Sequence, residues 1–152
     1  MTHSFISILS ILSIFFSCSS CDKNGNIIPN HSDMSRNRLL IKMGSKTFNA
    51  TLQDNPGTVA FKSLLPLTVN MKELNGNEKY ADLSRDLMTN ASNPGTIQSG
   101  DLMLYGSNTL VLFYKSFSTS YSYTKLGRVD DVTDIAAAVG KGSVTVTFEL
   151  EK

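Results

Sequence analysis

The feature that most constrains the fold is a repeated alternation of apolar and polar residues, which is typical of β-strands with one buried face. It is clearest in Lys46–Leu52, where Phe48, Ala50 and Leu52 share one face, and it recurs in Leu67–Leu74. Short turns rich in glycine and asparagine separate such segments. The sequence therefore predicts a mainly β protein.

Eight segments have the composition of strands. The predicted strands are Arg38–Met43, Lys46–Leu52, Leu67–Leu74, Glu78–Leu83, Asp101–Tyr105, Thr109–Lys115, Tyr123–Val129 and Ser143–Leu150. Thr109–Lys115 is almost continuously apolar, as expected for a strand buried on both faces. Closing such a sheet into a barrel removes its edges and buries the inward stripes. We therefore predict a closed β-barrel of about eight strands with two short helices at its ends.

The two helices are predicted from caps and breakers. The first begins at Asp54 or Asn55, either of which can cap a helix, and ends at Pro66. The second begins at a cap formed by Asp130 or Asp131, and its apolar stripe runs to the next glycine. The first helix is expected to plug one end of the barrel.

Cysteine and histidine are confined to the N-terminal part of this 152-residue chain. Cys18, Cys21, His3 and His31 all precede the first predicted strand. The predicted barrel therefore offers no cysteine nucleophile, Ser–His pair, disulfide or histidine zinc site, and we expect no metal and no cofactor. The formal charge of +1 is spread along the chain, which argues against a nucleic-acid partner.

The N-terminal residues have the pattern of an export signal. Phe5–Phe16 is an apolar run with interspersed serines, too short to span a bilayer but long enough for the core of a signal peptide. Small residues followed by Cys21 are similar to a bacterial lipoprotein cleavage site, and Cys18 fits the same pattern. The alternative is a plain secretory signal with incidental cysteines. We interpret Cys21 as the lipidation site.

These patterns divide the chain into three parts. Residues 1–21 are predicted to be a lipoprotein-type signal peptide, 22–37 a flexible polar tether, and 38–152 the β-barrel domain. The expected location is the bacterial cell envelope, where the lipid holds the protein to a membrane facing the periplasm or the surface.

Three central stretches resemble one known family. They are Gly100–Tyr105, Leu110–Tyr114 and Tyr121–Val129. Together they resemble the bacterial cyclophilin-like family, and the order of the predicted elements agrees from Leu39 to Glu149. The resemblance implies a closed eight-stranded barrel capped by helices. It does not imply an established activity, because the family is largely uncharacterised.

The resemblance also implies an alternative function, weak prolyl isomerisation on envelope proteins. Cyclophilins use an arginine of a Phe-His-Arg motif, which lies shortly before Gln-Gly-Gly-Asp-Phe, together with a glutamine and an apolar pocket. Ile97–Leu102 is similar to the second motif, but Asn90 stands where the arginine would be, and Arg85 is too far back. We assign no catalytic residue and keep Gln98 only as a candidate ligand contact.

Aromatic side chains are the better candidates for binding a ligand, because they offer large apolar surfaces with polar edges. The candidates are Phe113, Tyr114, Tyr121 and Tyr123. Tyr121 and Tyr123 share strand parity and adjoin a serine-rich loop, so we expect them to face one side with partial exposure. Phe113 fits plain barrel core at least as well.

Arg128 is the remaining candidate, because a guanidinium can bind a ligand carboxylate. The alternative role of Arg128 is an ion pair with Asp130, Asp131 or Asp134. The spacing of these three aspartates lacks the pattern of a calcium loop, so we interpret them as helix-capping residues. The sequence favours a module without established catalysis that holds a peptide or small ligand in an aromatic-rimmed cleft. A structural subunit of an envelope assembly is a further possibility, which would require a large exposed apolar patch.

Overall fold

The computed structural model describes residues 37–152. The predicted signal peptide, with Cys18 and Cys21, and all but the last residue of the predicted tether lie outside the described residues. Within 37–152, no helix combines the length and the apolar character needed to cross a bilayer.

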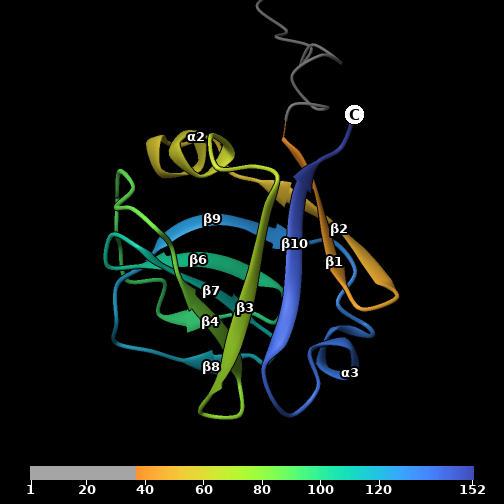
Figure 1. Ribbon diagram of the computed structural model, residues 1–152. Helices are drawn as coiled ribbons and strands as arrows, with labels where there is room; N and C mark the ends of the chain where they lie inside the picture. Colours follow the sequence, from red (N-terminus) through yellow and green to blue (C-terminus); the bar gives the residue numbers. More distant parts are fainter. Residues whose placement is uncertain (1–36) are drawn as a thin grey trace, which may run out of the picture.

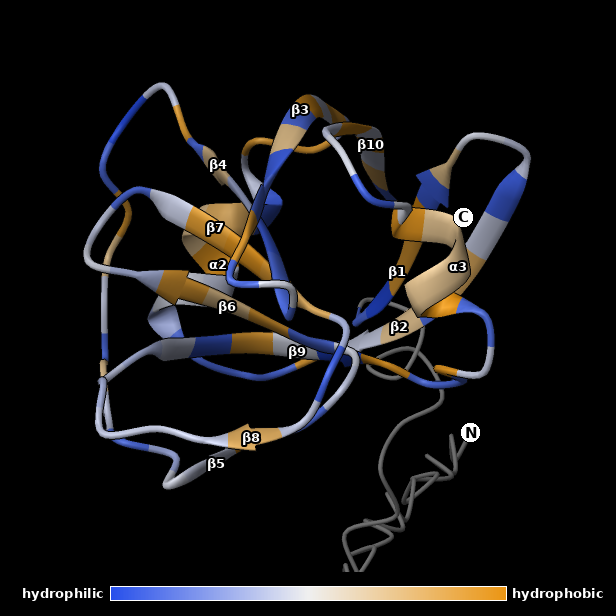
Figure 2. Cartoon of the chain, turned by 90° about the horizontal axis from the view of Figure 1, so that it is seen from below, coloured by the Kyte–Doolittle hydropathy of each residue, from blue (hydrophilic) through white to orange (hydrophobic). Residues whose placement is uncertain are grey.

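Eight antiparallel strands form a closed barrel (Figures 1 and 2). They are β1 (Arg38–Met43), β2 (Lys46–Leu52), β3 (Leu67–Leu74), β4 (Glu78–Asp82), β6 (Asp101–Tyr105), β7 (Thr109–Phe113), β9 (Thr124–Val129) and β10 (Val144–Leu150). The order around the barrel is β1, β10, β3, β4, β7, β6, β9 and β2, and β2 pairs again with β1. Every barrel strand therefore has two neighbours, and the predicted closed barrel is confirmed.

A two-stranded ribbon lies outside the barrel. β5 (Thr96–Ile97) pairs with β8 (Phe117–Ser118), and Figure 2, which looks along the barrel, shows both outside the ring of strands. We refer to this pair as the outer ribbon. The sequence predicted only a serine-rich loop around β8, because a two-residue strand is too short to show periodicity.

The outer ribbon gives the protein two apolar cores. In β7, Leu110 and Leu112 point into the barrel, whereas Val111 and Phe113 point outward and are buried under the ribbon. The prediction that this strand is buried on both faces is therefore confirmed. Successive side chains of a strand point to opposite faces, so a strand with cover on both sides must be apolar throughout.

The first helix, α2 (Pro56–Lys62), lies across one end of the barrel (Figure 1). Asn55 is its cap, because its Oδ1 accepts a hydrogen bond from the N–H of Thr58 at 2.9 Å. This confirms one of the two predicted caps. The helix ends at Lys62, earlier than the predicted stop at Pro66.

The second helix, α3 (Ile135–Val139), lies toward the other end beside β1 and β2 (Figure 1). The predicted caps were wrong: the helix follows Asp134, which makes no side-chain cap bond. Asp131 instead accepts hydrogen bonds from the N–H and hydroxyl of Thr133, and Asp130 pairs with Arg38 at 2.7 Å.

Candidate functional site

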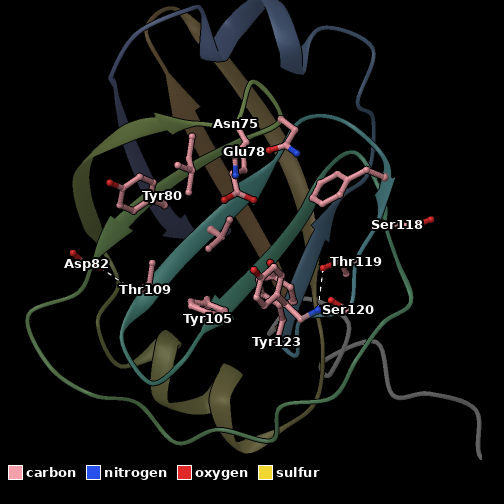
Figure 3. A pocket seen from close by; sticks show the side chains of 15 residues that line it. Asn75, Glu78, Tyr80, Asp82, Tyr105, Thr109, Ser118, Thr119, Ser120 and Tyr123 are labelled. Atoms are coloured by element: carbon pink, nitrogen blue, oxygen red, sulfur yellow. Dashed lines mark hydrogen bonds between the residues drawn. The ribbon is translucent and has the colours of Figure 1, made fainter.

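A cavity of about 590 Å³ lies on the outer face of the barrel wall (Figure 3). Strands β4, β7 and β6 form one side of it, and the segment from Phe117 to Tyr123, which begins in the outer ribbon, forms the other. The volume falls in the range of sites that hold small organic ligands. We refer to it as the outer cavity.

The alternation of β4 decides which of its side chains reach the outer cavity. Glu78, Tyr80 and Asp82 line it, whereas Lys79 and Ala81 point into the barrel. The β6–β7 hairpin adds Tyr105 and Thr109, whose positions in register place them side by side on the outer face. The rigid part of the site is therefore built from three neighbouring barrel strands.

Five aromatic rings form a continuous row at this site. Phe117 packs on Phe113 with ring centroids 5.6 Å apart, and Phe113 meets the edge of Tyr123 at 5.5 Å. Tyr123 contacts Tyr105 at 5.5 Å, and Tyr105 meets the edge of Tyr121 at 6.1 Å. Phe113 is fully buried beneath the cavity, and the other four rings line it.

Exposed apolar surface gathers at the same place. The large apolar side chains exposed in residues 37–152 are Val59, Leu74, Met88, Tyr105, Tyr121 and Leu150. Three of these six, Leu74, Tyr105 and Tyr121, line the outer cavity. Single exposed apolar residues are normal, but a group of them around one concave site makes that site the candidate binding surface.

The charged residues that line the outer cavity are both acidic. Asp82 is exposed, and its Oδ1 accepts a hydrogen bond from the hydroxyl of Thr109 at 2.8 Å. Glu78 is only 9% exposed and has no hydrogen bond or ion pair with any residue in 37–152. Its burial, and then the charge of Glu73, raise the pKa of its carboxyl group. Burial, followed by the charge of Glu78, also raises the pKa of Tyr123.

A second ionic cluster occupies the inner face of the same strand. Lys79, fully buried, donates to Glu73 at 2.5 Å and to the carbonyl oxygens of Gly140 and Gly142 at 3.0 and 2.5 Å. The hydroxyl of Tyr114 donates to Glu73 at 2.7 Å. Burial and then this hydrogen bond raise the pKa of Tyr114 to about 12. This cluster attaches the loop after α3 to β3 and β4.

Two of the residues predicted to bind ligand, Tyr121 and Tyr123, line the outer cavity. The prediction assumed that both follow the alternation of one strand, but they do not lie on one strand. Tyr123 forms an isolated bridge with Ser92, and Tyr121 lies in the loop before it. They contact Tyr105 through different geometries, and this shared contact is what brings them together.

The other four predicted ligand residues lie elsewhere. Phe113 is beneath the cavity, and Tyr114 belongs to the cluster around Lys79. The backbone N–H of Gln98 donates to Asp101 at 2.9 Å in the turn before β6. Arg128 is exposed on β9, outside the lining of the outer cavity.

Two of the three aspartates considered as partners of Arg128 pair with other cations: Arg38 pairs with Asp130, and Lys46 pairs with Asp134. The third, Asp131, accepts hydrogen bonds from Thr133. Across residues 37–152, no three His, Cys, Asp or Glu side chains gather in a way that could hold a metal ion.

Sequence analysis missed Glu78, Tyr80 and Tyr105 as site residues. Glu78 and Tyr80 occupy alternate positions of a predicted strand, so parity could have placed them on one face. Tyr105 ends a predicted strand directly before a glycine turn. What the sequence lacked was the pairing of β4 with β7 and of β7 with β6, which brings these residues together.

Comparisons with known proteins agree on the fold. The model of the cyclophilin-like family matches residues 41–149. The solution structure of the hypothetical protein AF2241 from Archaeoglobus fulgidus is similar, with a TM-score of 0.52 and 17% sequence identity, over 77% of this chain and 96% of that one. At this identity the likeness shows the fold alone. No curated protein matches the sequence.

Proposed function

This chain belongs to the cyclophilin-like family, and from that premise we propose that its barrel is a binding module that holds a peptide or small organic ligand in the outer cavity. The observation that carries the proposal is the gathering of Leu74, Tyr105 and Tyr121, half of the exposed large apolar side chains in residues 37–152, around one concave site. Keeping such side chains in water is unfavourable, and a ligand would remove them from it.

The construction of the site supports this role. Tyr105 is fixed by the pairing of β6 with β7 and β9, so one wall is rigid before any ligand arrives. The opposite wall is the loop from Ser118 to Tyr121, in which the N–H of Tyr121 donates to the hydroxyl of Thr119 at 3.1 Å. A preformed wall lowers the entropic cost of binding, because fewer groups must be ordered.

The alternative drawn from the resemblance, a weak prolyl isomerase, gains no support from the outer cavity. None of its lining residues is an arginine, and neither Gln98 nor Arg85 is among them. Arg85 donates to the hydroxyl of Ser63 at 2.6 Å instead. Isomerase activity therefore remains a prediction from the resemblance.

A binding screen tests the proposal. The full chain would be titrated with a library of small aromatic and dipeptide fragments and followed by ¹H–¹⁵N NMR spectra. Hits are expected to shift the resonances of Tyr105, Thr119 and Tyr121. Tyr121→Ala should weaken them on the order of tenfold, because it removes one aromatic wall.

The matched control is Met88→Ala. Met88 is 66% exposed against 61% for Tyr121, and it does not line the outer cavity. This variant should bind hits as the wild type does. Hits that shift only residues outside the cavity, or that bind Tyr121→Ala as tightly as the wild type, would overturn the proposal.

The proposal also includes attachment to the bacterial envelope. Its support is the sequence: Phe5–Phe16 has the length of a signal-peptide core, and Cys21 follows small residues. Metabolic labelling with radioactive palmitate should mark the wild type and fail to mark Cys21→Ser. Unchanged labelling of Cys21→Ser would move the site to Cys18, and absence of label in the wild type would remove the anchor.

A further inference from the structure

The outer cavity has a strong bias in charge. Glu78 and Asp82 line it, and no lysine, arginine or histidine does. The nearest cation along the chain, Lys79, points to the other face of β4, where Glu73 and two carbonyl oxygens already neutralise and hydrogen-bond it. The negative charge on the cavity side is therefore left without a positive partner among residues 37–152.

Glu78 is the centre of this imbalance. It is 9% exposed, projects from β4 into the outer cavity, and makes no hydrogen bond or ion pair with the described residues. Figure 3 shows it near Asn75 with Tyr80 to one side, and Tyr105 and Tyr123 toward the opposite end of the cavity. A carboxylate that is mostly buried and has no protein donor is costly, since its ionised form loses part of its hydration and only the cavity side can supply a partner. The raised pKa of Glu78, caused by burial and by Glu73, reports the same cost.

The residue before Glu78 also carries a hydrogen-bond acceptor without a partner in the described part of the chain. The side-chain Oδ1 of Asn77, another lining residue, is buried and has no hydrogen-bond partner among the described residues. Buried polar atoms are normally paired, and here two consecutive residues that line one cavity both lack a donor within residues 37–152. Acceptors on two consecutive lining residues suit a group that carries several N–H bonds better than a group with one.

The tyrosine rings that line the same cavity can contact the rest of a ligand held at Glu78. The faces of tyrosine rings carry partial negative charge and attract cations within about 6 Å of the ring centre. Resting on the ligand-binding role proposed above, we propose that the outer cavity selects an organic cation, whose ammonium or guanidinium N–H groups donate to Glu78 while its apolar stem packs on the tyrosines. The natural source is a lysine or arginine side chain of a peptide, or a free alkylamine.

The test compares three probes on the full chain by NMR titration: the capped tripeptide acetyl-Ala-Lys-Ala-amide, its neutral analogue with norleucine in place of lysine, and n-butylamine. The lysine peptide is expected to shift resonances of Glu78 and Tyr105 and to bind at least tenfold more tightly than the norleucine peptide. Glu78→Gln should weaken the lysine peptide on the order of tenfold, because a charge-assisted hydrogen bond is lost.

Asp54→Asn is the matched control, because it removes the same charge from an exposed residue outside the cavity and should leave binding unchanged. Equal binding of the lysine and norleucine peptides at the cavity would overturn the inference and leave the proposed ligand site standing. Equal affinity of the wild type and Glu78→Gln for the lysine peptide would also overturn it. Failure of both cationic probes to shift cavity resonances would overturn it too, and the fragment screen would then decide the ligand site separately.

The two cationic probes distinguish a peptide side chain from a free amine as the source of the cation. Tight binding of the lysine peptide with weak binding of n-butylamine supports a peptide ligand, since the flanking backbone then adds contacts. Comparable affinity for both supports a free amine.

Discussion

Replacing Glu78 with glutamine is expected to stabilise the free protein at neutral pH, against the usual trend for a buried residue. Glutamine keeps the length and shape of the side chain and removes only the charge. Glu78 is 9% exposed and lacks a donor, so the charge raises the free energy of the folded state without a compensating bond. The amide still needs hydration, so we expect a gain of about 1 kcal/mol.

The gain in stability of Glu78→Gln over the wild type should be larger at high pH than at low pH. Burial and Glu73 raise the folded-state pKa of Glu78 above its ordinary value of 4.5. The folded state then holds the proton more tightly than the unfolded state. The wild type therefore loses stability as the pH rises from 4.5 through the folded-state pKa of Glu78. The difference between Glu78→Gln and wild type should be full above the folded-state pKa, should shrink as the pH falls from that pKa toward 4.5, and should be lost below 4.5.

Urea unfolding at pH 7 and pH 4 measures this directly, and at pH 7 the melting temperature should rise by about 4 °C for a domain of this size. Asp82→Asn is the control, because Asp82 is exposed on the same face of β4 and asparagine can still accept the bond from Thr109. It should change stability by less than about 0.5 kcal/mol. A destabilised Glu78→Gln at pH 7, or a gain equal at both pH values, would show that Glu78 has a partner and would refute the reasoning.

Three further substitutions test the barrel itself by urea unfolding. Lys79→Met should cost about 3 kcal/mol, because it leaves Glu73 and two carbonyl oxygens without their cation; an unchanged midpoint would show that the pair is not stabilising. Gly127→Ala should cost about 2 kcal/mol, since its new Cβ would lie 2.6 Å from the backbone oxygen of Thr51; wild-type stability would contradict this close approach. Asn55→Ala should cost about 1 kcal/mol through the lost cap of α2, and Asn55→Asp should retain most of it.

The barrel could be predicted because its strands carry their own signal. A period of two in segments such as Lys46–Leu52 reports which side chains point inward, and no distant residue is needed to read it. The strand order could not be derived in this way. β10 pairs with β1 and β3, and β4 with β7, through registers that join residues far apart in the chain.

The errors at α3 show where local rules fail. Asp130 and Asp131 are both good capping residues, and the sequence offered no reason to reject either. The structure uses Asp130 for Arg38, which lies 92 positions away, and Asp131 for a turn with Thr133. Competition from a distant partner decided the outcome, and such competition is invisible in a local pattern.

The candidate site was predicted only in part for the same reason. Tyr121 and Tyr123 were identified because they are aromatic and adjoin a serine-rich loop, and both line the outer cavity. Glu78 lies on β4, which reaches β6 only through β7, so its place in the same cavity as Tyr105 depends on two strand pairings. Its lack of a partner is also a property of the folded state and has no counterpart in sequence.

The contrast between Glu78 and Lys79 is the strongest reason to expect a ligand. They are adjacent residues on one strand, both are nearly or fully buried, and both are charged types. For Lys79 the fold supplies a carboxylate and two carbonyl oxygens, so this barrel can satisfy a buried charge. For Glu78 it supplies aromatic rings and open space. A structural role would favour an uncharged residue there, because a neutral side chain would leave the free protein more stable, so the missing counter-charge is best explained as one that arrives with the ligand.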